Sequence, residues 1–151
     1  MNSGRSQLHA TATQKNTLYF QAIRDEGYGK ADIYRSSLID GIYQTPENLG
    51  PVINSENYEG DVFVAKDESY LIVSIYGRED DMGGGDLYIS FRNDNDVRSP
   101  LKNMGTINSD QRDFCPMLSP DGKYFFFSSK RTGANDIYWV DAKVINLLRG
   151  D

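Results

Sequence analysis

The fold is decided by one stretch near the end of the chain, Ser119-Pro-Asp-Gly-Lys-Tyr-Phe-Phe-Phe-Ser-Ser-Lys-Arg-Thr-Gly-Ala-Asn-Asp-Ile-Tyr138. Its first four residues predict a tight turn, because Pro at the second turn position fixes φ and Gly at the fourth suits a type I turn. The run 124–129 is almost continuously apolar, which is typical of a strand covered on both faces. Together with strands expected at 114–118 and 136–140, it predicts an antiparallel meander.

The same pattern occurs earlier in the chain. The segment Asp67-Glu-Ser-Tyr-Leu-Ile-Val-Ser74 aligns with Asp121-Gly-Lys-Tyr-Phe-Phe-Phe-Ser128 at an offset of 54 residues. A tripeptide of Asp, an aliphatic residue and Tyr begins at Asp32, Asp86 and Asp136. Short strands that recur with a period of about 50 residues indicate the blades of a β-propeller.

We therefore predict an all-β protein of propeller type, a single domain of three antiparallel meanders of the four-stranded kind with a short C-terminal helix. The predicted units are blade one over 6–55, blade two over 56–109, blade three over 110–141 and a helix over 142–150. The expected strands are 7–11, 18–23, 32–37 and 42–45 in blade one, 61–65, 70–76, 86–91 and 98–101 in blade two, and the three already given in blade three. The helix replaces the fourth strand of blade three.

The quoted stretch resembles the WD-like β-propeller repeat of the TolB type, and the resemblance extends in weaker form over residues 6–141. The family is bacterial, and its relatives are expected to have six or more blades. An exported, periplasmic location is implied by the resemblance alone. Propellers of this kind include both binding proteins and non-catalytic domains of peptidases, so the resemblance implies a fold and leaves the activity open.

Three blades cannot close a ring, because propellers typically need four to eight. An open arc is expected to leave one apolar face of blade one and one of blade three in water. We expect a homodimer joined through these open blade edges, which gives a six-bladed ring of three plus three. The alternative is that the chain is an incomplete part of a longer propeller.

Composition excludes several classes of protein. The 151 residues carry 22 acidic and 16 basic side chains, a formal charge of −6, which argues against nucleic acid as a partner. The sequence has no apolar run of the roughly 18 residues that a membrane span needs, and no secretory signal at its N-terminus. One cysteine and one histidine allow no internal disulfide and no His/Cys zinc set of the usual size, so no metal site of that kind is predicted.

A candidate ligand site lies at the start of each first strand, which in a propeller lines the central channel. In the repeat alignment His9, Asp61 and Cys115 share one position, and Glu59 and Asp113 share another just before it. We predict that His9, Glu59, Asp61 and Asp113 bind a ligand at the channel mouth. Carboxylates there could hold calcium or accept hydrogen bonds from a sugar or a peptide amine, and no other cofactor is predicted.

A second repeated feature is an arginine shortly after each second strand and an aspartate at the start of each third strand. These residues are predicted to form charge-assisted bridges that brace the blades. The predicted pairs are Arg24 with Asp32, Arg78 with Asp86, and Arg131 with Asp136.

The sequence favours a non-catalytic module that binds a protein, peptide or glycan partner. No catalytic residue is predicted, because Gly-x-Ser-x-Gly is absent and the only histidine lies in the weakest repeat. The rival hypothesis is a carbohydrate-active or peptide-processing hydrolase that uses carboxylates at the channel mouth.

Overall fold

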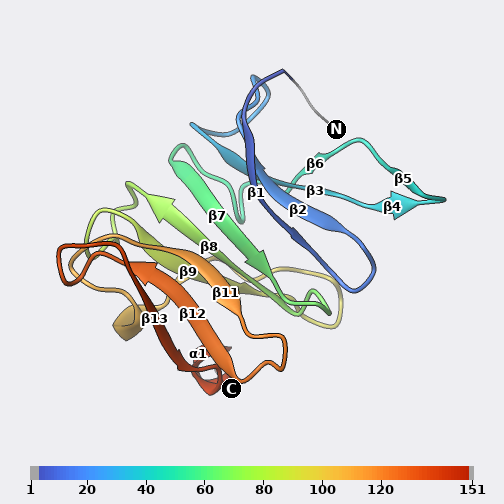
Figure 1. The fold of residues 1–151 in the computed structure, drawn as a ribbon. Coiled ribbons are helices and arrows are strands. Elements are labelled where there is room, and N and C mark those ends of the chain that lie inside the picture. The colour runs from blue at the N-terminus through green and yellow to red at the C-terminus, as the bar shows by residue number, and fades with distance from the viewer. Residues whose placement is uncertain (1–3, 150–151) are drawn as a thin grey trace.

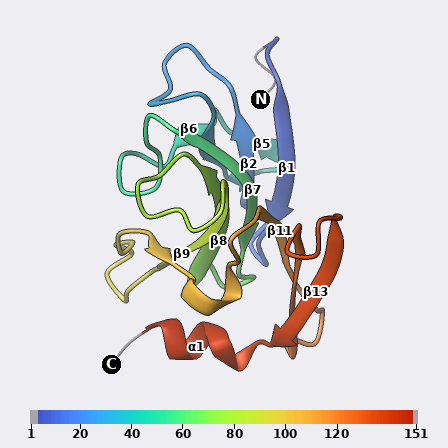
Figure 2. The same cartoon turned by 90° about the vertical axis from the view of Figure 1, so that its left-hand side faces the viewer.

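The computed structural model describes residues 4–149 and confirms the all-β class, with three antiparallel sheets that follow one another along the chain (Figures 1 and 2). The first sheet is blade one, with its strands in the order β1-β2-β3-β6. Their bounds are β1 Gln7–Ala12, β2 Leu18–Ala22, β3 Asp32–Ser36 and β6 Glu47–Asn48. Two short strands, β4 (Leu38–Ile39) and β5 (Ile42–Tyr43), form a separate hairpin that projects from the body.

Blade two has four strands in one meander, and blade three has three followed by the helix. The bounds in blade two are β7 Tyr58–Val64, β8 Tyr70–Tyr76, β9 Asp86–Phe91 and β10 Lys102–Asn103, with a short 3₁₀ turn over Gly105–Ile107. The bounds in blade three are β11 Asp113–Leu118, β12 Tyr124–Ser129 and β13 Asp136–Asp141.

The predicted fourth strands, 42–45 and 98–101, are wrong. In blade one, residues 42–43 pair with 38–39 across Asp40-Gly41, both with positive φ, so this Asp-Gly pair makes a hairpin turn. In blade two, Arg98 forms only an isolated bridge with Arg92. The outer strands are instead the two-residue β6 and β10, which contain Asn48 and Asn103.

These two asparagines hold the aspartates that begin β3 and β9. The Asn48 Nδ2 donates to Asp32 Oδ2 at 2.7 Å, and the Asn103 Nδ2 donates to Asp86 Oδ2 at 2.8 Å. Both aspartates are buried and also accept backbone N–H bonds from the preceding loop. A buried carboxylate is tolerated only when it is paired or hydrogen-bonded, so the outer strand is needed to anchor the third strand.

A second asparagine in each of these blades clamps the second residue of the third strand. Asn54 accepts from Ile33 N at 2.8 Å and donates to Ile33 O at 3.0 Å. Asn108 makes the same two bonds with Leu87, at 2.9 and 3.0 Å. Each amide therefore acts as a further strand residue and completes the pairing at the outer edge of the sheet.

The repeated arginines have partners other than those expected. Arg78 pairs with Asp80 and Arg131 with Asp113, so the predicted bridges to the third-strand aspartates are replaced in blades two and three. In every blade the arginine lies over the tyrosine two residues beyond the aspartate. The guanidinium carbon is 4.8 Å from the ring centre for Arg24 on Tyr34, 4.7 Å for Arg78 on Tyr88 and 4.6 Å for Arg131 on Tyr138. The repeat therefore preserves a cation–π stack rather than an ion pair.

The core contains two large apolar clusters on opposite faces of blade two and a small third cluster on blade one, made of Phe20, Ala22 and Tyr34. Strand β8 contributes to both large clusters, since Leu71, Val73 and Ile75 pack toward blade one while Ile72 packs toward blade three. Alternate residues of a strand point to opposite faces, which explains why this strand is apolar throughout.

Helix α1 (Lys143–Arg149) closes the lower end of the second cluster (Figure 2). Ile145 is buried there, and the Arg149 guanidinium lies over the Phe91 ring at 4.8 Å. The predicted helix agrees within its described part, and Gly150 lies outside the described residues. Within residues 4–149, no helix is long and apolar enough to cross a membrane.

The outward face of blade three is open. Leu87 and Ile89 in blade two are 0% exposed, whereas their counterparts Ile137 and Trp139 in blade three are 77% and 61% exposed. Blade one differs from our expectation, because Phe20 and Tyr34 on its outward face are only 3% and 2% exposed. Only one of the two end sheets therefore presents a large apolar surface to water.

We predict that Asn108→Ala lowers the free energy of unfolding by about 2 kcal/mol, because the buried Leu87 N–H loses its acceptor, while Leu87 O keeps the hydrogen bond from the Met104 N–H. Urea unfolding followed by far-UV circular dichroism measures the change. Asn135→Ala in an exposed loop is the matched control and should change the value by less than about 0.5 kcal/mol. Equal effects of the two substitutions would contradict the role of the clamp.

Candidate functional site

The first strands of the three blades, β1, β7 and β11, lie side by side and form one wall of the molecule (Figures 1 and 2). Each is interrupted by a bulge, between Leu8 and Thr11, between Glu59 and Val62, and between Phe114 and Met117. A bulge adds an unpaired residue and re-aims a side chain. His9, Asp61 and Cys115 occupy these bulges, and their ligand atoms lie within 4.8 Å of one another.

Asp61 is the centre of this group, which we call the bulge cluster (His9, Asp61 and Cys115). Its Oδ1 lies 2.8 Å from His9 Nε2. Its Oδ2 accepts from the Cys115 backbone N–H at 3.0 Å and from the thiol at 3.3 Å. The carboxylate therefore links one residue of blade one and one of blade three to blade two, in addition to backbone hydrogen bonds between blades such as Glu59 N to Ala31 O and Asp113 N to Gly85 O.

The side chains of the cluster differ in how exposed they are to solvent. The side chain of Asp61 is 11% exposed and that of His9 is 44% exposed, so the imidazole lies at the surface above a nearly buried carboxylate. Burial and the neighbouring Asp61 carboxylate raise the pKa of the Cys115 thiol to about 11. At neutral pH the thiol is therefore protonated and can donate to Asp61.

Glu59 and Asp113, predicted at the channel mouth, are fully buried instead. Asp113 accepts from Arg131 at 3.1 Å and from the Ser109 backbone and hydroxyl at 2.7 and 2.8 Å. Glu59 accepts from the Ser55 hydroxyl at 2.6 Å, while its other oxygen has no hydrogen-bond partner. Both are anchors between neighbouring blades and lie out of reach of a ligand in the channel.

The two anchors differ in whether the repeated arginine reaches them. Arg131 pairs with Asp113 in blade three, whereas Arg78 of blade two pairs with Asp80 instead of Glu59. Burial without a cationic partner raises the pKa of Glu59 from 4.5 to about 7. Blade two therefore holds a carboxyl group that titrates near neutral pH.

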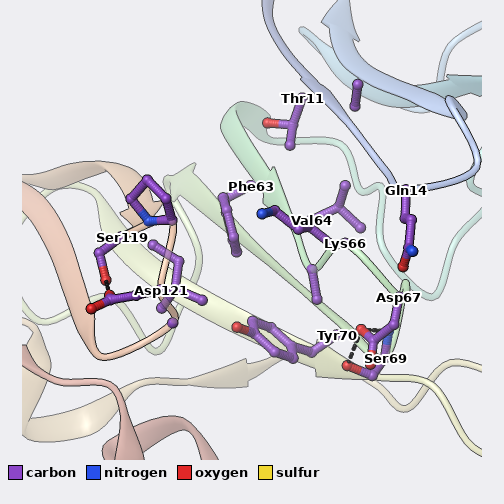
Figure 3. Close-up of a pocket in the computed structure, with 15 residues that line it drawn as sticks. Thr11, Gln14, Phe63, Val64, Lys66, Asp67, Ser69, Tyr70, Ser119 and Asp121 are labelled. Carbon is purple, nitrogen blue, oxygen red and sulfur yellow. Dashed lines mark hydrogen bonds between the residues drawn. The ribbon is translucent and has the colours of Figure 1, made fainter.

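A groove extends from the bulge cluster along the three first strands. Its upper part is a hollow of about 480 Å³ that His9, Asp61 and Cys115 help to line. Its lower part is a hollow of about 600 Å³ between the turns that follow these strands, shown in Figure 3. Thr11, Ala12 and Phe63 line both parts, so the two are continuous.

The lower part of the groove combines an apolar floor with a polar rim. Phe63, Val64 and Tyr70 form the floor, and Lys66 and Asp67 come from the turn above it (Figure 3). Asp67 is held by the Ser69 hydroxyl at 2.7 Å, which lowers the pKa of its carboxyl group. A few fixed polar groups around an apolar floor are typical of a binding site.

Sequence reasoning found part of this site. The repeat alignment placed His9, Asp61 and Cys115 at one position, and the structure brings them together. It missed Cys115 as a member of the site, and it missed the lower groove altogether. The signal for the groove was present in the turns, because residues that end adjacent first strands must lie at one end of the molecule.

Comparison with known proteins supports the fold. A crystal structure of TolB from Acinetobacter baumannii is similar, with a TM-score of 0.67 at 19% sequence identity over 93% of this chain and 31% of that chain. A putative TolB from Agrobacterium tumefaciens aligns with a TM-score of 0.46 at 15% identity over 95% of this chain and 61% of that chain. No family model and no curated protein matches the sequence. The chain thus spans less than two thirds of either TolB structure, and the likeness establishes its β-propeller fold.

Glu59 is predicted to make stability depend on pH. Its pKa is higher in the folded state, so its proton stabilises the fold fully below about pH 4.5, and this contribution is lost as pH rises toward 7. Glu59→Gln cannot ionise. The free energy of unfolding of Glu59→Gln minus that of the parent should therefore be larger at pH 8 than at pH 4, by on the order of 3 kcal/mol.

Urea unfolding of both proteins at pH 4, 6 and 8 measures this difference. Glu56→Gln, an exposed neighbour, serves as the control and should leave the pH profile of the parent unchanged. Parallel profiles for the parent and Glu59→Gln would show that the carboxyl group has the same pKa in the folded and unfolded states, and would contradict the raised value.

Proposed function

We propose that this protein is a non-catalytic β-propeller module that binds an extended peptide segment of a partner protein. The observation that carries the proposal is the continuous groove along β1, β7 and β11. Its two hollows, about 480 and 600 Å³, together exceed the volume that a single small ligand needs. A groove that follows the strands suits an elongated ligand better than a compact one.

The chemistry of the groove favours a peptide over a glycan. Phe63 and Tyr70 offer apolar contact area to side chains, while Lys66 and Asp67 offer opposite charges to polar groups of a backbone. Peptide binding of this kind takes most of its energy from a few aromatic anchors. We place this interaction in the periplasm, the location that the resemblance to TolB-type repeats implies.

The alternative of a hydrolase has little support in the geometry. The carboxylates predicted for it at the channel mouth were Glu59, Asp61 and Asp113, and Glu59 and Asp113 are not exposed to the groove. Asp61, the third of these acids, is held by His9 and Cys115. A glycosidase needs two carboxyl groups on either side of the scissile bond, so one engaged carboxylate does not suffice.

We propose further that a second copy of the chain covers the open face of blade three and completes a six-bladed ring. Strand β12 has the same apolar run as β8, which is covered on both faces by neighbouring blades. Tyr124, Phe126, Trp139 and Ile137 form the uncovered face. Its counterpart in the second copy would be the face of blade one beside Leu18.

Selection of a random peptide library against the immobilised protein tests the groove. We expect enriched peptides with aromatic and acidic residues, whose affinity falls about tenfold for Lys66→Glu and is unchanged for Lys30→Glu, an exposed control in blade one. Mass spectrometry of the bound peptides should show them intact. Failure to enrich peptides, or equal affinity for the two variants, would contradict groove binding, and cleaved peptides would favour the hydrolase.

Light scattering after size exclusion tests the assembly, with an expected mass of about 34 kDa for two chains of 17.0 kDa. Ile137→Glu should reduce the mass to that of one chain, because it buries a charge in the contact. Leu147→Glu, equally exposed but on α1, should not. Leu18→Glu should also dissociate the dimer if the two copies form a ring, because blade one is then part of the contact. If the dimer forms only between the two blade-three faces, Leu18→Glu should leave its mass unchanged.

A further inference from the structure

The bulge cluster joins three different metal-binding side chains from three blades. We propose that His9, Asp61 and Cys115 bind one divalent cation of the zinc class, with imidazole nitrogen, carboxylate oxygen and thiolate sulfur as ligands. Their ligand atoms already lie within 4.8 Å of one another. The proposal is independent of peptide binding in the groove, since it rests on the upper hollow alone.

The donor set selects the class of cation. Thiolate and imidazole ligands favour zinc, cobalt or copper, whereas calcium takes six to eight oxygen atoms. The bulge cluster offers the oxygens of a single carboxylate. Glu59 and Asp113, which a calcium site at the channel mouth would have needed, are buried elsewhere. A borderline-soft cation is therefore favoured over the hard cation that the sequence suggested.

The geometry requires only small movements. Bond lengths of about 2.0 Å to nitrogen and oxygen and about 2.3 Å to sulfur place the ligand atoms of a tetrahedral ion roughly 3.3 to 3.6 Å apart. The observed separations are 2.8 Å between His9 Nε2 and Asp61 Oδ1 and 3.3 Å between Cys115 Sγ and Asp61 Oδ2, while all three ligand atoms lie within 4.8 Å of one another. The two distances involve different oxygens, so an ion would be bound by both Asp61 oxygens or after a rotation of the carboxylate. The exposed imidazole can move outward to admit an ion, because its side chain is not enclosed.

Binding would also improve the charge balance of the site. The charged neighbour on the Cys115 side is Arg112, which stacks on Tyr76 and Phe114, and Tyr76 lies against the cluster from β8. A divalent cation would displace the thiol proton to the solvent, so that thiolate, carboxylate and cation sum to zero charge. The hydrogen bonds from His9 and the thiol to Asp61 would be replaced by metal–ligand bonds.

Three protein ligands leave one tetrahedral position unfilled. Catalytic and ligand-binding zinc sites share this arrangement, whereas structural sites use four protein ligands. The cluster lines the upper hollow, so the fourth position would face the groove and be taken by water or by a donor atom of a bound molecule. A metal here would therefore act as a Lewis-acidic contact point in the channel.

Cobalt(II) titration of the untagged protein under reducing conditions tests the site directly. We expect one equivalent to produce a thiolate-to-cobalt charge-transfer band and the strong visible absorption of tetrahedral cobalt, both abolished by one equivalent of zinc. The band can come only from Cys115, the single cysteine of the chain. Isothermal titration calorimetry should give one zinc ion bound per chain. Calcium should bind much more weakly than zinc in the same experiment.

Three substitutions separate this site from adventitious binding. His9→Gln, Asp61→Asn and Cys115→Ser should each weaken zinc binding at least about 100-fold, and Asp94→Asn, an exposed control, should not change it. His9→Gln is the decisive variant, because an exposed histidine can be replaced without unfolding the protein. Absence of the charge-transfer band, unchanged zinc affinity in His9→Gln, or tighter binding of calcium than of zinc would overturn the proposal.

Discussion

A blade of this protein cannot be stable on its own, because each central strand is apolar on both sides and needs a neighbouring sheet against each. Strand β8 shows the requirement fulfilled: Leu71, Val73 and Ile75 are buried against blade one, and Ile72 against blade three. The burial of such side chains contributes roughly 1.5–3 kcal/mol each, and the many apolar residues between the blades make this the main contribution to stability. The buried polar side chains have a different role: their hydrogen bonds determine how the strands and blades are aligned.

The asparagine clamps illustrate that task. Asn54 and Asn108 extend the hydrogen bonding of β3 and β9 beyond the two-residue outer strands, and Asn48 and Asn103 donate hydrogen bonds to the aspartates that begin them. Blade three has no such outer strand. There Asp136 is exposed and accepts from Thr132 instead, and α1 covers the cluster that the missing strand leaves. The helix is thus a local substitute for the end of a blade.

The sequence predicted the long strands well because their apolar runs are continuous and the repeat shows each of them more than once. It failed for the outer strands, which have two residues each and no apolar pattern; their signal was the conserved spacing of asparagines within the repeat. The predicted arginine–aspartate bridges of blades two and three were wrong for a similar reason, because spacing along the chain does not show which side chains are in contact. Spacing along the chain showed that Arg78 and Asp86 recur together, but the ring of Tyr88 next to them provides the contact.

The bulge cluster has equivalent backbone positions in the three blades but a different side chain at each of them. A repeat places equivalent backbone positions around an axis, so identical residues there would offer identical donors at every blade. Here the equivalent positions hold His9, Asp61 and Cys115, which have different hardness, charge and exposure. The bulges turn all three toward one point, and Asp61 is already hydrogen-bonded to both neighbours. The same three side chains therefore hold the first strands of three blades together through Asp61 and supply the three types of ligand on which the proposed ion site depends.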